Sequence, residues 1–269
     1  MGLRIHSNMS ALNAGRQVGN TTRGLAATLN QLASGLHINR AADDAAGLAI
    51  AERFRTRVRQ YQQEANSLQS GINAVRTAEG GLDVQQEAVG RLRELTVQAS
   101  NGTLTDDQRA ALNEEAQQLI DQINDIGENT EFNGQALLNG EAAEIELGTE
   151  GGNAIRIEES TAESLGVQGI DLSTAEGAAA AVNTLDAAAQ RLSQNRASLG
   201  AQENRLESAI NQRTIGIENA GAAESAIRDA DLARVTMARA QNEVLLRAGL
   251  GALTQANVVP QSAMALLGG

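Results

Sequence analysis

The chain has 269 residues and a formal net charge of −12, and its composition excludes several classes of protein. It contains no cysteine and no lysine, which excludes disulfides, thiolate metal sites, Schiff-base chemistry and the P-loop lysine. Aromatic residues make up 1% of the chain, so any core is built from aliphatic side chains, as is typical of long helices packed side by side.

Residues suited to catalysis are scarce. His6 and His37 are the only histidines, both in a stretch predicted to be an amphipathic helix, and no G-x-S-x-G motif occurs. We therefore expect no enzyme activity, no catalytic residue, no metal site and no cofactor. The acidic net charge disfavours nucleic acid as a partner. No run of about 18 apolar residues occurs, so a membrane is not expected as a partner either.

The N-terminal residues 1–44 are predicted to form one amphipathic helix followed by a linker. No acidic residue occurs in 1–40, a feature shared with mitochondrial transit peptides, but the apolar pattern continues without a break that would mark cleavage. The linker is expected at 38–44, where capping residues gather. The apolar stripe alternates steps of four and three: Val18, Thr22, Leu25, Leu29, Leu32 and Leu36, preceded in a shifted phase by Ile5, Met9 and Leu12.

The same spacing continues over about 45–99 and predicts a helix on the order of 80 Å long. Asn101 and Gly102 break the pattern, and Thr105 with Gln108 offers a capping box for a second helix over about 105–127. The apolar stripe of the long helix consists of Phe54, Val58, Tyr61, Ala65, Leu68, Ile72 and Val75, then Ala88, Leu92 and Leu95.

Farther along the chain the period changes to two, which predicts a β-hairpin over about 142–158. Ser173 and Glu176 then form a second expected capping box, ahead of a helix over about 174–228. Leucine recurs there every seven residues, at Leu185, Leu192, Leu199 and Leu206. A DNA-binding zipper is the alternative, but no basic region precedes these leucines. Some heptad positions expected to face other helices, called seam positions, are charged and can fix the register between helices. These residues are Arg196, Glu203, Arg213 and Glu224.

The C-terminal residues 230–269 are predicted to form a last apolar-striped helix. Both terminal helices lack a helical partner adjacent in sequence. They can pair with each other, but two narrow stripes leave apolar surface over, which predicts assembly with neighbouring chains. The residues expected to carry this polymerisation are Ile5, Leu12, Leu25, Leu29, Leu32, Leu246, Leu250 and Leu253.

Several segments of the chain resemble bacterial flagellin. The similar segments cover essentially the whole chain and occur in the same order as in the family. The chain lacks the variable outer domain that many family members insert near 165–175. The resemblance therefore implies a minimal flagellin. The resemblance is found in the following segments: the run from Ile5 to Leu36, residues 38–47, Arg93–Leu95 with Val97 and Gln98, residues 130–134 and residues 255–261.

The resemblance implies a mainly α fold, with a long antiparallel helical rod that resembles a coiled-coil bundle and a small β-hairpin region. Residues 1–44 and 230–269 would pair as inner-core helices of a filament, and 45–229 would form the rod domain. The implied function is a structural subunit that polymerises into the flagellar filament for motility. A hook–filament junction protein and a non-flagellar coiled-coil adhesin are the alternatives.

Partners and location follow from the same resemblance. It implies a helical homopolymer of this chain, contacts with a flagellar export chaperone and with hook-junction and cap proteins, and an extracellular location reached by type III export without a cleavable signal peptide. Arg91, Leu95 and Glu115 match family positions contacted by the vertebrate Toll-like receptor that detects flagellin. Arg91 and Leu95 are four residues apart and so are expected to share one helix face, which Glu115 would reach from the next helix.

Overall fold

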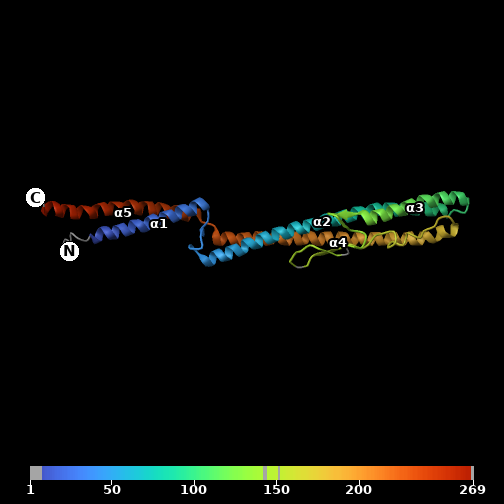
Figure 1. The fold of residues 1–269 in the computed structure, drawn as a ribbon, viewed down its shortest axis with the longest axis horizontal. Helices are drawn as coiled ribbons and strands as arrows, with labels where there is room; N and C mark the ends of the chain where they lie inside the picture. Colours follow the sequence, from blue (N-terminus) through green and yellow to red (C-terminus); the bar gives the residue numbers. More distant parts are fainter. Residues whose placement is uncertain (1–7, 142–143, 151, 268–269) are drawn as a thin grey trace. The chain divides into compact units, whose positions relative to one another are not determined.

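The computed structural model describes residues 8–141, 144–150 and 152–267, with the backbone alone described over 259–267. These residues form long helices and two short antiparallel sheets (Figure 1). The elements in chain order are α1 Met9–Ser34, α2 Ala45–Ala99, α3 Asp106–Asn129, β1 Glu131–Phe132, β2 Gln135–Ala136, β3 Glu144–Glu146, β4 Ala154–Arg156, α4 Ala175–Arg228 and α5 Leu232–Leu267. The expected fold class is thereby confirmed.

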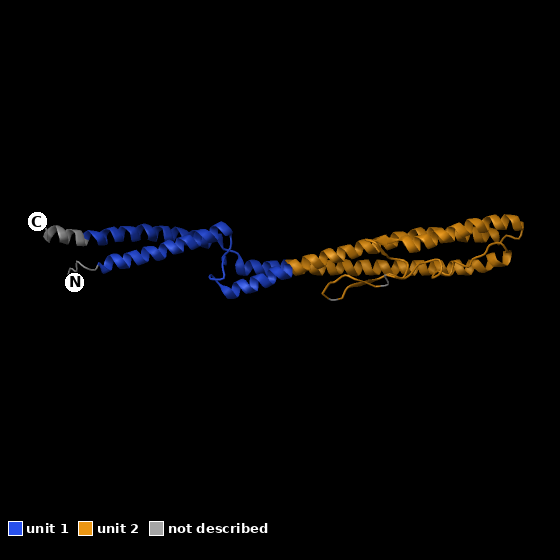
Figure 2. Cartoon of the chain, viewed as in Figure 1, with its two compact units in different colours: residues 1–58, 218–269 blue, residues 59–217 orange. Residues whose placement is uncertain are grey.

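The chain forms two compact units (Figure 2). Unit 1 comprises 1–58 and 218–269, and unit 2 comprises 59–217. Unit 1 therefore contains α1, α5, the first turns of α2 and the last turns of α4. The division of the chain at 44 and 229 stays a prediction.

The first helix has a defined cap at each end. The Asn8 side chain accepts a hydrogen bond from the Ala11 amide at 3.0 Å, which satisfies a free donor of the first turn. Gly35 ends the helix with φ 71° and donates its amide to the Gln31 carbonyl. Glycine adopts this left-handed conformation without the steric cost that a Cβ would bring. The caps at Asn8 and Gly35 therefore define where helix α1 begins and ends.

Of the two expected capping boxes, one is confirmed. Thr105 Oγ1 accepts from the Gln108 amide at 3.4 Å, and Gln108 Oε1 accepts from the Thr105 amide at 3.0 Å. The box at Ser173 is wrong, because Thr174 caps α4 by accepting from the Gly177 amide at 3.0 Å. The Ser173 amide instead donates to Asp171 at 2.8 Å, and the Ser173 hydrogen bonds hold the pKa of that carboxyl below its usual value.

The predicted hairpin is present as β3 and β4, with Ile145 paired to Ile155. A second hairpin, β1 with β2, was not predicted. Its turn is Asn133–Gly134, both with positive φ (55° and 78°), and an Asn-Gly pair is the strongest short-range hairpin signal. The sequence therefore carried this signal, although the strands of two residues each are too short to show a period of two.

The core of unit 2 lies between α2, α3 and α4 and the segments that connect them. The leucines spaced seven apart on α4 are all buried, as the heptad predicts. Gln85 is fully buried and donates to the carbonyls of Ile123 (2.9 Å) and Ser160 (2.7 Å), which fixes the 158–172 segment to α2 and α3. The largest fully buried side chains of this core are Leu68, Leu82, Leu92, Leu95, Ile123, Leu137, Leu138, Ile155, Leu172, Leu185, Leu192 and Leu206.

Charged seam residues of α4 pair with α2. Arg196 lies 2.8 Å from Asp83, Glu203 lies 2.8 Å from Arg76 and Arg213 lies 2.7 Å from Glu64. These pairs join residues whose order runs in opposite directions on the two helices, so they set the antiparallel register. No helix in the described part of the chain combines the length and apolar character needed to cross a membrane.

Candidate assembly surface

Helices α1 and α5 pack against each other as an antiparallel pair, called the helix pair below (Figure 1). Asn8 Nδ2 donates to the Ala256 carbonyl at 2.8 Å near one end of the pair. Near the other end, backbone hydrogen bonds join His37 to Arg228 and Ala230 to Gly35. The pair is therefore fixed in register at both ends of its length.

The seam of the helix pair follows a heptad on both helices. On α1 one set of half-buried or buried residues is spaced by three and four, and on α5 one set is spaced by four and three. A Cβ at Gly249 would lie 2.9 Å from Val18 Cγ2, so this glycine permits close approach of the helices. The seam residues are Ala11, Ala14, Val18, Thr21, Leu25, Thr28 and Leu32 on α1, and Val235, Arg239, Asn242, Leu246, Gly249, Leu253 and Ala256 on α5.

This seam differs from the predicted stripe, because Met9 and Leu12 were expected in it but are 59% and 60% exposed, and at two further places it is displaced by one helical position. Thr21 and Thr28 are buried where Thr22 and Leu29 were expected, and the Leu29 side chain is 44% exposed. Each buried threonine satisfies its hydroxyl within the helix, with Thr21 Oγ1 donating to the Gln17 carbonyl at 2.9 Å. The correction matters because it leaves Leu29 available on the surface.

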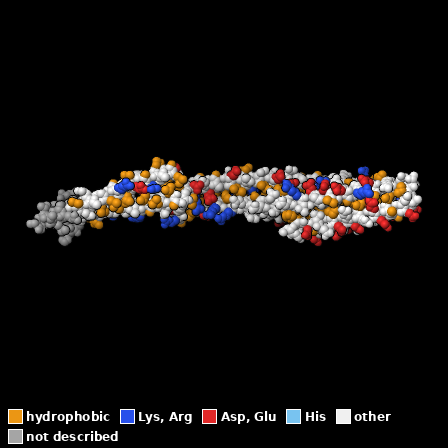
Figure 3. Space-filling model, turned by 90° about the horizontal axis from the view of Figure 1, so that it is seen from above, with side chains coloured by type: hydrophobic (Ala, Val, Ile, Leu, Met, Phe, Trp, Pro, Cys, Tyr) orange, Lys and Arg blue, Asp and Glu red, His pale blue; other side chains and the backbone are white. Residues whose placement is uncertain are grey.

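The helix pair buries very little apolar surface of its own. Among its described side chains, Val235 is the only buried aliphatic residue, and it is still 6% exposed. Nine of the 13 exposed large hydrophobic side chains of the described chain lie on these two helices. Figure 3 shows orange side chains along the visible face of the pair, with blue ones among them. The nine residues are Met9, Leu12, Leu29, Leu232, Met237, Val244, Leu245, Leu250 and Val258.

Three of the exposed apolar side chains of α5 lie along one line of the helix surface. Met237, Val244, Gly251 and Val258 are seven residues apart and lie on the face of α5 opposite its seam with α1. The Met237 and Val244 side chains are both 66% exposed, and Val258 is 50% exposed. We call these four residues the outward row. This row was not predicted, although its signal, a second repeat of seven residues, is present in the sequence.

The residues expected to carry polymerisation fall into three groups. Leu12 and Leu250 are exposed, as is Leu29. Ile5 lies outside the described residues. The remaining four are half-buried in the seam between α1 and α5: Leu25, Leu32, Leu246 and Leu253.

The connection between α1 and α2 is held by two aspartates. Asp43 accepts hydrogen bonds from the amides of Asn39 (3.0 Å) and Arg40 (2.9 Å). These donors favour the charged form and hold the pKa of Asp43 below its usual value. Asp44 accepts from the Gly47 amide at 2.9 Å and so caps the start of α2.

The expected receptor patch is partly assembled in unit 2. Arg91 Nη2 lies 2.8 Å from Glu115 Oε1 and its Nη1 lies 3.0 Å from Glu94 Oε2. These two carboxylates, Glu115 foremost, raise the pKa of Arg91 above its ordinary value. Leu95 is only 1% exposed and packs in the core. The structure therefore brings Arg91 and Glu115 together at the surface, whereas Leu95 anchors the helix face beneath them.

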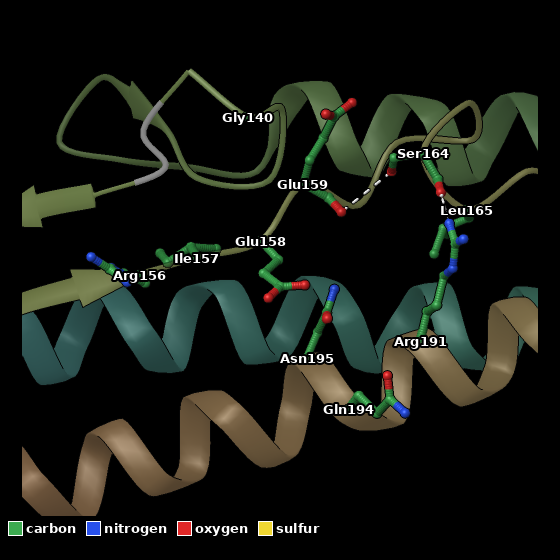
Figure 4. Close-up of a pocket in the computed structure, with 10 residues that line it drawn as sticks. All are labelled: Gly140, Arg156, Ile157, Glu158, Glu159, Ser164, Leu165, Arg191, Gln194 and Asn195. Atoms are coloured by element: carbon green, nitrogen blue, oxygen red, sulfur yellow. Dashed lines mark hydrogen bonds between the residues drawn. The ribbon is translucent and has the colours of Figure 1, made fainter.

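A polar groove of about 620 Å³ lies between α4 and the segment that follows β4 (Figure 4). Arg191 donates from its guanidinium to the Ser164 carbonyl, and Ser164 Oγ donates to the Glu159 carbonyl at 3.3 Å. The polar groups of the groove thus hold this segment against α4. Within the described residues, no group of three side chains is placed to bind a metal ion.

Comparison with known proteins places the chain beside flagellar filament proteins. Residues 5–143 match the bacterial flagellin N-terminal helical region, and residues 182–267 match the bacterial flagellin C-terminal helical region. The chain is 38% identical to a flagellin of Halalkalibacterium halodurans over 98% of its own length and 99% of that protein's. It is 35% identical to a flagellin of Bacillus subtilis over 98% of its length and all of that protein's.

Two further flagellar proteins are also similar to this chain. The chain is 35% identical to the flagellar filament 33 kDa core protein of Treponema phagedenis, over 98% of this chain and 99% of that protein. The crystal structure of Bacillus cereus flagellin matches 55% of this chain and 88% of its own, with 29% identity and a TM-score of 0.49.

Proposed function

This chain belongs to the bacterial flagellin family and is a structural subunit of the flagellar filament, and we propose that it polymerises through the exposed faces of its helix pair. The observation that carries the proposal is that the described part of the pair buries only one aliphatic side chain, Val235, and exposes nine large hydrophobic ones. Burying one such side chain contributes about 1.5–3 kcal/mol. Further copies of the chain are the partners that cover this surface.

The outward row is the face that we expect to meet another subunit. It lies opposite the seam with α1, so binding a second copy there does not require the helix pair to open. Contact between two different surfaces of successive copies, related by a rotation that does not close, generates an open helical polymer. Leu250 lies next to Gly251 of this row, and Leu12 and Leu29 add exposed apolar surface on α1.

Single substitutions on α5 test this proposal. Val244→Asp places a carboxylate in the outward row, where the monomer tolerates it because the side chain is 66% exposed. In a filament the same charge is buried without a partner, at a cost of several kcal/mol. We expect unchanged helicity by circular dichroism and no sedimentable filaments when monomer is added to seeds. Leu250→Asp should behave in the same way.

Val244→Leu is the matched control, because it keeps the row apolar and should polymerise. Normal filaments from Val244→Asp, seen by electron microscopy, would show that this row faces solvent in the polymer. That result would contradict the proposed contact.

A second proposal concerns the Arg91–Glu115 patch as a recognition surface for the flagellin-sensing Toll-like receptor. It is supported by the ion pair at 2.8 Å, which holds the half-exposed Arg91 guanidinium in one position. A held arginine loses little conformational freedom on binding, and interface arginines are frequent hot spots. Leu95 would support this patch from the core.

Arg91→Ala tests the recognition proposal. We expect receptor activation by monomer to fall about thirtyfold in apparent affinity, which corresponds to about 2 kcal/mol. Arg93→Ala is the matched control, because its side chain is 57% exposed and pairs with Asp186 rather than with Glu115. Equal signalling by the wild type and the Arg91 variant would show that the patch is not the recognition surface.

We extend the proposal to how the subunit reaches its place. We propose export by the flagellar type III route without a cleavable signal, with an export chaperone and with hook-junction and cap proteins as partners. The composition supports this, because a chain with one proline and no cysteine has few slow refolding steps after export. The role of the chain in the filament is structural rather than catalytic.

A further inference from the structure

The first part of α2 carries a dense run of positive charge. Arginine occupies alternate positions at Arg53, Arg55, Arg57 and Arg59, and all four side chains are exposed. Arg55 and Arg59 are four residues apart and so share one face of the helix, called the arginine face below. Among the described residues, Arg59 has no carboxylate within 4.0 Å, and Arg55 has only the exposed Glu52 of its own helix, at 3.5 Å. The arginine face therefore presents guanidinium groups that the chain itself neutralises very little.

The outer side of α3 carries the opposite charge. This helix contains seven carboxylates and a single arginine, Arg109. Five of the carboxylates are exposed on the side opposite the buried residues of α3, and in the described part of the chain none of these five has an arginine within 4.0 Å. Four of them are seven residues apart, so they form a line of like charges about 10.5 Å apart. The five residues, called the acidic face below, are Asp107, Glu114, Asp121, Asp125 and Glu128.

The arginine face and the acidic face are too far apart to neutralise each other within one chain. Helix α3 packs along the later part of α2, where Arg91 binds Glu115 and where a Cβ at Gly81 would lie 2.8 Å from Thr130 Oγ1. Arg59 precedes Gly81 by 22 residues on the same helix, which is about 33 Å at 1.5 Å per residue. No arginine side chain spans that distance. The two faces can therefore meet only between two copies of the chain.

We propose that the arginine face of one copy docks on the acidic face of another. This contact rests on the proposed polymerisation and adds to it a surface separate from the outward row. With the two copies parallel, Arg59 reaches the level of Arg91 and Glu115 when one copy is shifted by 32 residues of helix, or about 48 Å. The two faces differ, so the contact repeats from copy to copy and builds an open polymer rather than a closed dimer.

The spacing of the charges favours a second copy over a metal ion as the occupant of the acidic face. Arg55 and Arg59 are four residues apart, as are Asp121 and Asp125, so two ion pairs can form at once between the two helix faces. The carboxylates are spread along the helix, and the described residues include no group of three acidic or histidine side chains that could hold a metal ion. Anionic partners are repelled by this face.

Charge reversal tests the contact. One variant carries Asp121→Arg with Asp125→Arg, and the other carries Arg55→Glu with Arg59→Glu, so each places like charges together where the copies meet. At low salt, we expect each variant to raise the monomer concentration in equilibrium with seeded filaments about tenfold, because two exposed ion pairs become two repulsions. Monomer helicity by circular dichroism should not change, since all four side chains are exposed.

A chain that carries all four substitutions restores the two ion pairs with their signs exchanged. Its equilibrium monomer concentration should return to within about threefold of the wild type, which a loss of folding or of apolar contact would not allow. In 0.5 M salt the two reversed variants should approach the wild type, because salt screens both attraction and repulsion. Electron cryomicroscopy of wild-type filaments should show Arg59 of one copy beside α3 of another, with the two copies offset by about 48 Å along α2.

The control for net charge is Glu87→Arg with Glu207→Arg. Both glutamates are exposed in unit 2, on α2 and α4, and neither has an arginine within 4.0 Å among the described residues. This variant changes the net charge as much as the reversal on α3 does, and it should polymerise like the wild type. Val244→Asp reports on the outward row alone: normal filaments from that variant would contradict the proposed function and leave the charge reversals to be judged separately.

Three results would overturn the docking of the two faces. Wild-type assembly by the Asp121→Arg, Asp125→Arg variant would show that the acidic face points to solvent in the filament. No recovery in the chain with all four substitutions would show that the two faces do not meet. An equal loss in the Glu87→Arg, Glu207→Arg control would assign the effect to net charge rather than to this contact.

Discussion

At the scale of single residues, one tight backbone contact in unit 2 lies at Gly127 of α3. A Cβ there would lie 2.7 Å from the Ser160 carbonyl oxygen and 3.1 Å from Thr161 Cα. Ser160 cannot easily move away, because Gln85 binds its carbonyl and accepts from its hydroxyl at 2.6 Å. Glycine is therefore required at this position by packing, since its φ is not positive.

We expect Gly127→Ala to lower the free energy of unfolding by about 1–3 kcal/mol, because the added methyl group forces backbone apart. Gly90→Ala is the control: it lies within α2, exposed, with nothing within 4 Å of the added Cβ. That change should raise the free energy of unfolding by about 0.5–1 kcal/mol. Urea denaturation followed by circular dichroism measures both. Equal stability of the two variants would contradict the tight contact.

At the scale of elements, the sequence predicts a helix face well where only one apolar repeat is present. The leucines of α4 occupy a single heptad, and all four are buried. On α1 two adjacent phases both contain apolar residues, so its own sequence does not decide between Thr28 and Leu29. The choice depends on α5, where Gly249 admits Val18 into the seam. The packing of the two helices together therefore decides which of these two residues is buried, and the sequence of one helix alone does not predict it.

The proposed receptor patch illustrates the same limit. Glu115 lies beside Arg91, as predicted, because α3 packs antiparallel to α2. Residues four apart differ by about 40° around a helix, however, which is enough to put Arg91 at the surface and Leu95 in the core. The periodicity of α2 already included Leu95 in its apolar stripe, so its burial could be predicted from the sequence.

The ion pair between Glu64 of α2 and Arg213 of α4 is the most buried of the described pairs that join these helices. The two side chains are 6% and 17% exposed, and Arg213 also lies 5.5 Å from the centre of the Tyr61 ring. Gln60 donates to Glu64 at 3.0 Å, and Arg213 donates to the Glu150 carbonyl. The pair thus connects α2, α4 and the loop of the β3–β4 hairpin.

Arg213→Met should lower the free energy of unfolding by about 3–5 kcal/mol, because it leaves the Glu64 carboxylate buried without its cation. Adding Glu64→Leu should restore most of the loss, since the uncompensated charge is then gone. Arg76→Ala, which breaks the exposed pair with Glu203, should cost at most about 1 kcal/mol. Thermal or urea unfolding checks all three, and a loss of under 1 kcal/mol in Arg213→Met would rule out a structural role for the buried pair.

At the scale of the whole molecule, the two units differ in how much they bury. Unit 2 has a continuous core of large aliphatic side chains between three helices. In unit 1, the seam of the helix pair mixes leucines and valines with alanines, threonines and one glycine, and few of its large side chains are fully enclosed. Ordering each residue costs about 1–2 kcal/mol in backbone entropy, which a small seam offsets only in part. The helix pair is therefore the part of the monomer with the least local stability.

This difference predicts how the free monomer responds to protease. We expect residues from about 45 to 228 to resist cleavage while both ends are cut rapidly, because local opening exposes the segments that bury least. Hydrogen exchange should accordingly be faster in 8–33 than in the buried turns of α2. Deleting 230–269 removes α5, so the remaining chain should stay soluble and helical but never polymerise, even on seeds. Slow exchange of 8–33 in dilute monomer, or filaments from the truncated chain, would show that the seam alone stabilises α1 and that α5 is not needed for assembly.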